Sequence, residues 1–112
     1  MSQDIFDQLC AVIADRKNNP SAEKSYVVHL LNGGVEKIGS KIREEAEELI
    51  EAAGEDDDDH TVYEAADLLF HTFVMLGHLD LPLDRVRAEL ARRFGISGIT
   101  EKESRQTKEI QS

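Results

Sequence analysis

The chain is poor in the residue types that stabilise secreted proteins or interrupt helices. Cys10 is the single cysteine among 112 residues, so an intrachain disulfide is excluded and the thiol is expected to pack within an apolar helix. The sequence has two prolines and no tryptophan, and no apolar run approaches the roughly 20 residues that span a bilayer. The first residues lack the basic region of a secretion signal. These absences predict a cytoplasmic protein without a membrane-spanning segment.

Basic residues are also few in comparison with acidic ones. The chain has 13 Lys and Arg residues against 23 Asp and Glu residues, which gives a formal net charge of −10. Such a surface repels nucleic-acid backbones and anionic membranes, so neither is an expected partner. A phosphate-bearing ligand would need a local group of cations. The length favours one domain over residues 1–112, with a tail that frays from about residue 103.

Hydrophobic spacing and chain breakers predict an all-α fold. Apolar residues recur at helical intervals in five segments, at about 4–17, 25–31, 35–53, 61–79 and from Pro82 to Gly95. Gly33-Gly34 separates the second segment from the third, and Gly54 ends the third. Asp59 is the expected N-cap of the fourth segment. Residues 55–60 then form an exposed turn between two antiparallel helices.

The segment 61–79 is apolar on almost every side. A helix of this kind must be covered all round, and a chain of this length can hardly cover it alone. We therefore expect a helical bundle whose central antiparallel pair is completed by homodimerisation. Phe70 or Phe73 is expected to lie against the second subunit.

Two acidic motifs occur on the predicted helix pair. Glu44, Glu45 and Glu48 form E-E-x-x-E, and Glu64 and Asp67 form E-x-x-D. Residues three apart lie on one helix face, so each motif gathers carboxylates that repel one another unless a cation joins them. A symmetric turn would place Glu48 beside Glu64 and Glu45 beside Asp67. Such a square of oxygens suits Mg²⁺, which usually completes its ligand shell with water and substrate phosphates.

A solvated acidic surface is the alternative explanation, because a chain this rich in carboxylates can produce E-E-x-x-E by chance. Glu45 argues against it, since it falls about 20° from Ile38 on the apolar side of its helix. Glu64 and Asp67 likewise lie on an otherwise apolar helix, where an unpaired buried charge is expensive. Other acidic residues are expected to face solvent, namely Glu47, Glu51 and the run 56–59.

A site of this composition predicts the hydrolysis of a phosphoanhydride. Mg²⁺ held by Glu45, Glu48, Glu64 and Asp67 would neutralise the phosphates. Glu44 is the candidate base for the attacking water.

Four further residues near these motifs have open roles. Lys37 and Lys41 precede the carboxylates on the same side of the helix, so each either reaches phosphate oxygens or forms a salt bridge with a glutamate. In the register described above, Lys41 lies beside His71. His71 is expected to be a packed histidine or a support for Asp67, and His78 is assigned no role.

The pattern of recognisable residues extends well beyond the carboxylates. It includes Ser25-Tyr26, Gly34, Glu36-Lys37-Ile38, Phe70-His71, Arg92-Arg93, Ser97-Gly98 and Glu101-Lys102. With the two acidic motifs, this order resembles the MazG-like all-α nucleotide pyrophosphatases, and more closely the phosphoribosyl-ATP pyrophosphatases of histidine biosynthesis. The resemblance implies hydrolysis of phosphoribosyl-ATP at its α,β-phosphoanhydride, giving phosphoribosyl-AMP and pyrophosphate. It also implies Mg²⁺ as cofactor and a homodimeric helical fold.

The resemblance further implies a set of substrate contacts around the carboxylates: Lys24, Ser25, Tyr26, Lys37, Lys41, Lys102 and Arg105. By residue type alone, Tyr26 is expected to pack and the tail cations to be solvated. The chain departs from the family pattern at Ser40, Arg43 and Glu47. Ser40 stands where a lysine is common, which removes one phosphate contact.

Two other functions are compatible with these motifs. A house-cleaning MazG-like pyrophosphatase would use the same carboxylates on common nucleoside triphosphates, with a different pocket for base and sugar. An acidic helical module that only binds a partner or buffers metal would not use them for turnover. Replacing Glu48 by Gln or Asp67 by Asn separates that module from an enzyme.

Overall fold

The computed structural model describes residues 4–19 and 25–95, and every regular element in these ranges is an α-helix. The all-α prediction is therefore confirmed. None of the described helices has the length and apolar character needed to cross a membrane. The predictions for Lys24, Lys102, Arg105 and the frayed tail lie outside the described residues.

The first helix, α1, spans Ile5–Asn18, close to the predicted segment 4–17. It begins where the Asp4 side chain accepts a hydrogen bond from the backbone N–H of Asp7, at 2.9 Å. This N-cap satisfies one of the amides that a helix leaves unpaired at its start. Near the other end, Lys17 Nζ donates to the carbonyl oxygens of Gly77 and His78, at 3.2 and 2.8 Å. These bonds tie α1 to the end of a helix 60 residues away in sequence.

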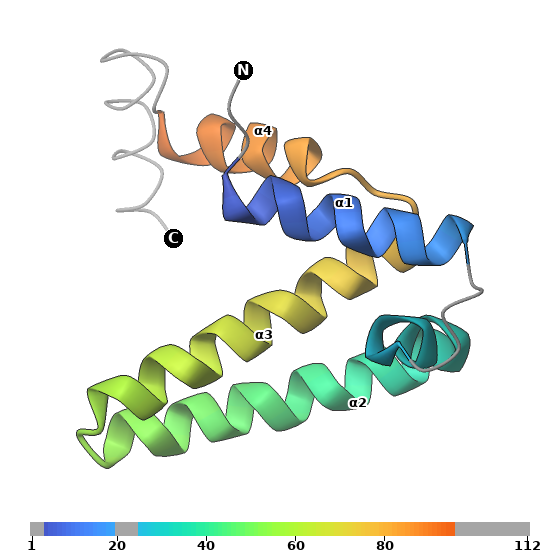
Figure 1. Cartoon of the computed structure of the whole chain (residues 1–112). Coiled ribbons are helices and arrows are strands. Elements are labelled where there is room, and N and C mark those ends of the chain that lie inside the picture. The colour runs from blue at the N-terminus through green and yellow to red at the C-terminus, as the bar shows by residue number, and fades with distance from the viewer. Residues whose placement is uncertain (1–3, 20–24, 96–112) are drawn as a thin grey trace. The chain divides into compact units, whose positions relative to one another are not determined.

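The second helix, α2, spans Tyr26–Gly54 and contains one sharp break. Gly34 has φ 69° and ψ −164°, a conformation that only glycine adopts readily. The break divides α2 into a short segment and a long one. These correspond to the two segments predicted at about 25–31 and 35–53. In Figure 1 the short segment is viewed nearly along its axis, whereas the rest of α2 runs across the view.

The third helix, α3, spans Asp58–His78. It begins two residues earlier than it would if Asp59 were its N-cap, as predicted. The N-cap is Asp57, whose carboxylate accepts from the backbone N–H of His60 at 3.0 Å. The prediction of Asp59 was wrong because several adjacent aspartates can all serve as caps. The correction places His60 inside the helix, with its side chain one turn before Glu64.

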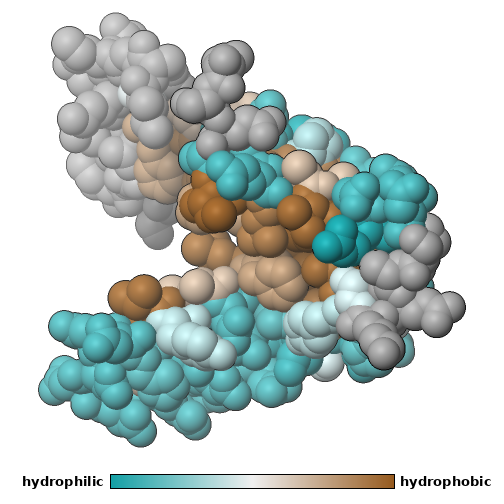
Figure 2. Space-filling model, in the orientation of Figure 1, coloured by the Kyte–Doolittle hydropathy of each residue, from teal (hydrophilic) through white to brown (hydrophobic). Residues whose placement is uncertain are grey.

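The chain forms two compact units, residues 1–81 and residues from Pro82 onward. In the first unit, α2 and α3 run antiparallel along each other and α1 packs against them (Figure 1). This confirms the predicted central helix pair. The fully buried side chains of this unit include Ile13, Leu30, Ile38 and Val74. Figure 2 shows hydrophobic side chains gathered over α1 and α3, while α2 presents mostly hydrophilic ones on this face.

The second unit contains α4, Leu83–Phe94, with Pro82 at its N-cap and Gly95 in the left-handed conformation at its C-cap. These bounds confirm the predicted ends of this helix. Glu89 accepts hydrogen bonds from Arg92 and Arg93 one turn further on, at 3.0 and 2.8 Å. These bonds lower the pKa of Glu89 to about 2.

Candidate metal centre

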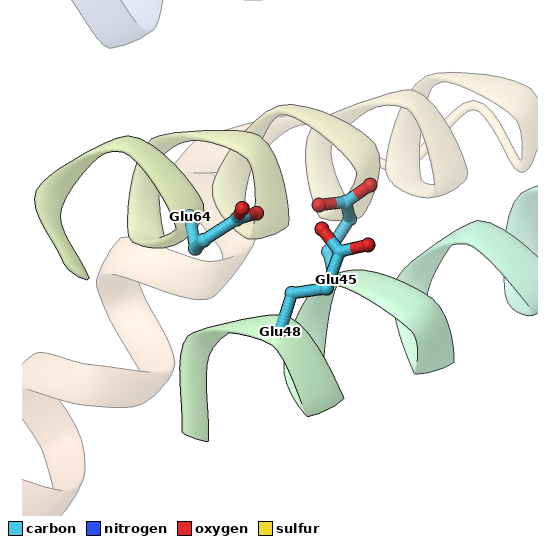
Figure 3. Close-up of side chains that lie close together, drawn as sticks. All are labelled: Glu45, Glu48 and Glu64. Carbon is cyan, nitrogen blue, oxygen red and sulfur yellow. The ribbon is translucent and has the colours of Figure 1, made fainter. Parts of the chain in front are cut away.

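Three carboxylates from two helices meet between α2 and α3. Glu45 and Glu48 come from adjacent turns of α2, and Glu64 comes from the first half of α3. One carboxylate oxygen of each lies within 4.8 Å of the others. Figure 3 shows the three side chains turned toward one another from the two helices. The predicted pairing of Glu48 with Glu64 across the helix pair is thus present in the structure.

Two of these carboxylates are buried and incompletely hydrogen-bonded. Glu45 is 4% exposed and Glu64 is 5% exposed. Glu45 Oε2 and Glu64 Oε1 are both inaccessible to solvent and have no hydrogen-bond partner. A buried oxygen without a donor is costly, so the arrangement favours a proton or a cation among these groups.

Burial and the nearness of like charges shift the pKa values of the three carboxylates. Burial is the largest cause that raises the pKa of Glu45, to about 8, helped by hydrogen bonding to Glu64 and by the charges of Asp67 and Glu48. The pKa of Glu48 is also raised, first by hydrogen bonding to Glu64 and then by burial. Burial opposes ionisation of Glu64, yet hydrogen bonds from Glu45, His60 and Glu48 lower its pKa overall. The cluster as a whole therefore favours a shared proton or a cation over three separate negative charges.

Asp67 lies close to this cluster without belonging to it. Its oxygens are not among those within 4.8 Å of one another. Its negative charge nevertheless acts on Glu45 and raises the pKa of that residue. The structure thus brings together three of the four predicted metal ligands, with the fourth beside them.

Glu44 and Lys41 pair with each other on the outer side of α2. Lys41 Nζ donates to Glu44 Oε1 at 3.4 Å, and the Glu44 side chain is about half exposed. Partial desolvation works against the charge on Lys41, but the hydrogen bond to Glu44 and the negative groups nearby raise the pKa of the lysine. The salt-bridge alternative for Lys41 is therefore the arrangement seen. Lys37, one turn earlier, is partly buried, and its carbonyl oxygen accepts from Ser40 Oγ at 2.9 Å.

A hydrogen-bonded chain links the start of α2 to α3 next to the cluster. The Tyr26 hydroxyl lies 2.9 Å from His71 Nε2, and His71 Nδ1 lies 2.8 Å from the backbone oxygen of Asp67. Because a carbonyl only accepts, Nδ1 carries the proton, and in a neutral imidazole the Tyr26 hydroxyl donates to Nε2. The Tyr26 ring stacks on Phe70 with centroids 6.0 Å apart. Ser25 caps α2 by accepting from Val28 N–H at 3.4 Å.

These contacts refine the prediction for His71 and give His60 a partner that the sequence analysis missed. His71 is 2% exposed and supports the backbone of Asp67, since its partner is the carbonyl oxygen of that residue. His60 was given no role from the sequence, yet its Nε2 lies 3.0 Å from Glu64 Oε2. The spacing of four residues between His60 and Glu64 was the available signal.

The residues of the cluster fit a hard divalent cation. All of their donor atoms are carboxylate oxygens, which Mg²⁺ prefers over nitrogen or sulfur. Glu45 and Glu64 both belong to this cluster and each buries an oxygen without a partner, so an ion there would offset the cost of burying them. Electrostatic repulsion among the three carboxylates would be relieved at the same time.

One family model and several known proteins are similar to most of this chain. The family model for phosphoribosyl-ATP pyrophosphohydrolase matches residues 6–94. A phosphoribosyl-ATP pyrophosphatase of Rhodopirellula baltica is 56% identical over 89 residues, covering 77% of this chain and 74% of that protein. One of Geotalea daltonii is 48% identical over 105 residues, covering 94% and 98%. One of Neisseria meningitidis is 44% identical over 106 residues, covering 94% and 97%.

Proposed function

The chain belongs to the phosphoribosyl-ATP pyrophosphohydrolase family, and from this premise we propose that it hydrolyses phosphoribosyl-ATP to phosphoribosyl-AMP and pyrophosphate in histidine biosynthesis. The observation that carries the proposal is the cluster of Glu45, Glu48 and Glu64, with two buried carboxylate oxygens that lack partners. An acidic surface that merely keeps the protein soluble would not bury these groups. The reaction takes place in the cytoplasm.

Glu45, Glu48 and Glu64 would hold Mg²⁺, with Asp67 beside them as the fourth acidic group. When bound, the ion would neutralise part of the phosphate charge and act as a Lewis acid on the phosphoanhydride that is hydrolysed. Burial of the carboxylates makes their attraction for a cation stronger than it would be in water. Because the chain has a net charge of −10, it repels a polyphosphate. The substrate can therefore bind only where bound cations or basic side chains offset the negative charge of the protein.

The chain's own residues would orient the substrate and move the proton. Water attacks the α-phosphorus, the bond from that phosphorus to the bridging oxygen breaks, and pyrophosphate leaves. Glu44 is the proposed base that takes the proton of the water, because its side chain is half exposed and adjoins the buried cluster. Lys41 holds Glu44 through their salt bridge and can turn to a phosphate oxygen when substrate binds. Tyr26 lies near the same charges and is proposed to contact the substrate.

The remaining proposed substrate contacts are Ser25, Lys37 and three cations outside the described residues, Lys24, Lys102 and Arg105. A local group of lysines and arginines would offset the acidic character of the chain where phosphates bind.

We also propose that the functional unit is a homodimer formed through α3. Phe73 is buried within the chain, where it packs edge-on against Phe6 at 5.5 Å. Val62 and Leu69, two turns apart on one face of α3, remain 69% and 42% exposed. A second subunit would cover this apolar face.

The activity is tested by comparing hydrolysis of phosphoribosyl-ATP with hydrolysis of common nucleoside triphosphates, each with Mg²⁺. We expect phosphoribosyl-ATP to have the higher kcat/KM, with pyrophosphate as product. Faster turnover of ordinary or damaged triphosphates would assign the chain to the house-cleaning pyrophosphatases. Glu48→Gln and Asp67→Asn are expected to abolish turnover, and wild-type rates in both variants would exclude a catalytic role for the acidic motifs.

A further inference from the structure

His60 makes a direct hydrogen bond to the acidic cluster although the mechanism above gives it no task. Its Nε2 lies 3.0 Å from Glu64 Oε2, and the two residues are one turn apart on α3. The Glu64 side chain is 6% exposed, whereas that of His60 is 44% exposed. The pair therefore differs from an ordinary surface salt bridge, since one partner is buried among other carboxylates.

The first turn of α3 holds His60 in place. The Asp57 cap accepts from the backbone N–H of His60 at 3.0 Å, and Thr61 Oγ1 donates to the Asp57 carbonyl at 2.7 Å. These bonds fix the backbone from which the imidazole reaches Glu64. The ring is thus anchored by the helix start, while its tip contacts the cluster.

The two carboxylate oxygens of Glu64 have different surroundings. Oε2 accepts from the imidazole, and Oε1 is buried without a hydrogen-bond partner. One oxygen of this carboxylate lies within 4.8 Å of oxygens of Glu45 and Glu48. Movement of the Glu64 side chain away from this position would break its bond to His60.

We propose that His60 is a positioning residue, which holds the Glu64 carboxylate oriented toward Glu45 and Glu48 for a divalent cation. The inference rests on the proposed metal-dependent function of the same cluster. Groups that orient metal ligands typically change metal affinity by about 10- to 100-fold when they are removed. His60 acts through Glu64 and is not itself a ligand in this proposal.

The test is calorimetric titration of the full chain with Mg²⁺, and with Mn²⁺ as a second probe, in the absence of substrate. His60→Phe and His60→Ala both remove the donor and are expected to weaken binding by about 10-fold or more. His60→Gln keeps an N–H that can reach Glu64 and is expected to bind the ion nearly as tightly as wild type. His29→Phe, at an exposed histidine of α2, is the control and is expected to leave affinity unchanged.

The outcomes separate this inference from the proposed function. Wild-type affinity in both His60→Phe and His60→Ala would overturn the positioning role and leave the metal site intact. Equal loss in His60→Gln and His60→Phe would also overturn it, because a hydrogen-bond donor would then not be what matters. Absence of ion binding by the wild-type chain would reject the metal site and the inference together. Normal ion binding without hydrolysis of phosphoribosyl-ATP would reject only the substrate.

A second readout distinguishes positioning from a general structural effect. If His60 acts through metal affinity, raising the Mg²⁺ concentration restores hydrolysis by His60→Phe toward the wild-type kcat. Failure of saturating Mg²⁺ to restore turnover, with the helical circular dichroism unchanged, would contradict the proposal.

Discussion

At the scale of single residues, burial decides what each carboxylate does. Glu44 and Glu45 are neighbours in sequence, yet Glu44 is half exposed and paired with Lys41, whereas Glu45 is 4% exposed. The difference follows from the 100° turn between successive helical residues, which points one side chain outward and the other toward α3. One acidic motif therefore supplies both a solvent-accessible carboxylate and a buried one.

The buried carboxylate makes stability depend on pH in the metal-free protein. The folded-state pKa of Glu45, about 8, lies above its ordinary value of 4.5. Its contribution to stability is fully present below pH 4.5 and is lost as pH rises through about 8. We expect Glu45→Gln to be more stable than wild type at pH 8.5 by at least about 1.4 kcal/mol, the equivalent of one pKa unit.

This expectation is checked by urea denaturation of both proteins in EDTA from pH 4.5 to 8.5. Wild type should lose stability over this range more steeply than Glu45→Gln. Added Mg²⁺ should reduce the difference by binding the ionised cluster. Parallel pH profiles of the two proteins in EDTA would show that Glu45 is not held neutral by its surroundings.

At the scale of the helices, two different local features shape the pair formed by α2 and α3. Gly34 breaks α2 well before the acidic motif, and Asp57 starts α3 shortly before Glu64. The break affects the direction of the α2 axis, and the cap fixes the residue at which α3 begins. Both therefore affect where the carboxylates of these helices lie. Their effects can be measured separately, because Gly34 lies within α2 and Asp57 caps α3.

The break at Gly34 is expected to require glycine. Gly34→Ala places a side chain in a backbone region that is nearly restricted to glycine, which costs about 1–3 kcal/mol. Gly39→Ala is the control, because an added Cβ there meets only Met75 Cε at 4.0 Å and should gain up to about 1 kcal/mol of helix propensity. Opposite signs in the free energies of unfolding would confirm the strained break. Equal effects would indicate that the helix bends without strain at residue 34.

The cap of α3 is expected to depend on one aspartate of the acidic turn. Asp57→Ala removes the acceptor for the His60 amide and should lower the free energy of unfolding by about 1 kcal/mol. Asp59→Ala should cost less, because Asp59 lies within the first turn and contributes mainly through the helix dipole. Thermal or urea denaturation of both variants checks this order. A larger loss in Asp59→Ala would favour the cap predicted from sequence.

At the scale of the whole molecule, the chain combines a strongly acidic composition with an exposed apolar face on α3. The net charge of −10 disfavours association of two copies, so the contact must bury enough hydrophobic surface to overcome it. Val62 and Leu69 offer such a surface on α3, and Tyr63 beside them is also exposed. Added salt should strengthen a dimer of this kind by screening the repulsion.

The dimer is tested by light scattering coupled to size-exclusion chromatography. Wild type should have twice the 12.6 kDa chain mass, and Leu69→Glu should shift the mass toward the monomer because it places a charge on the apolar face. Glu47→Lys changes the charge on an exposed position of α2 and should remain dimeric. A dimeric Leu69→Glu, or a monomeric wild type, would contradict an interface through this face of α3.

The sequence by itself determined the helices, most of their end residues and the burial of the Glu45 side chain. Helical periodicity is local, so the apolar side of α2 and its one buried carboxylate could be deduced from residue spacing. The breaks at Gly34 and Gly95 followed from backbone preferences that belong to glycine alone. The choice of Asp57 over Asp59 did not follow, because adjacent aspartates have the same local capacity to cap.

Tertiary structure alone decided which of the carboxylates come together. The sequence places five acidic residues on two helices, but only Glu45, Glu48 and Glu64 form the cluster. Asp67 lies outside it and acts on Glu45 through its charge. Tertiary structure also gave His60 and His71 their partners, Glu64 and the backbone of Asp67. The physical reason is that side-chain contacts between helices depend on helix register and rotation to within an ångström or two. Those quantities are set by the packing of the whole core, whereas local spacing specifies only the face on which a side chain lies.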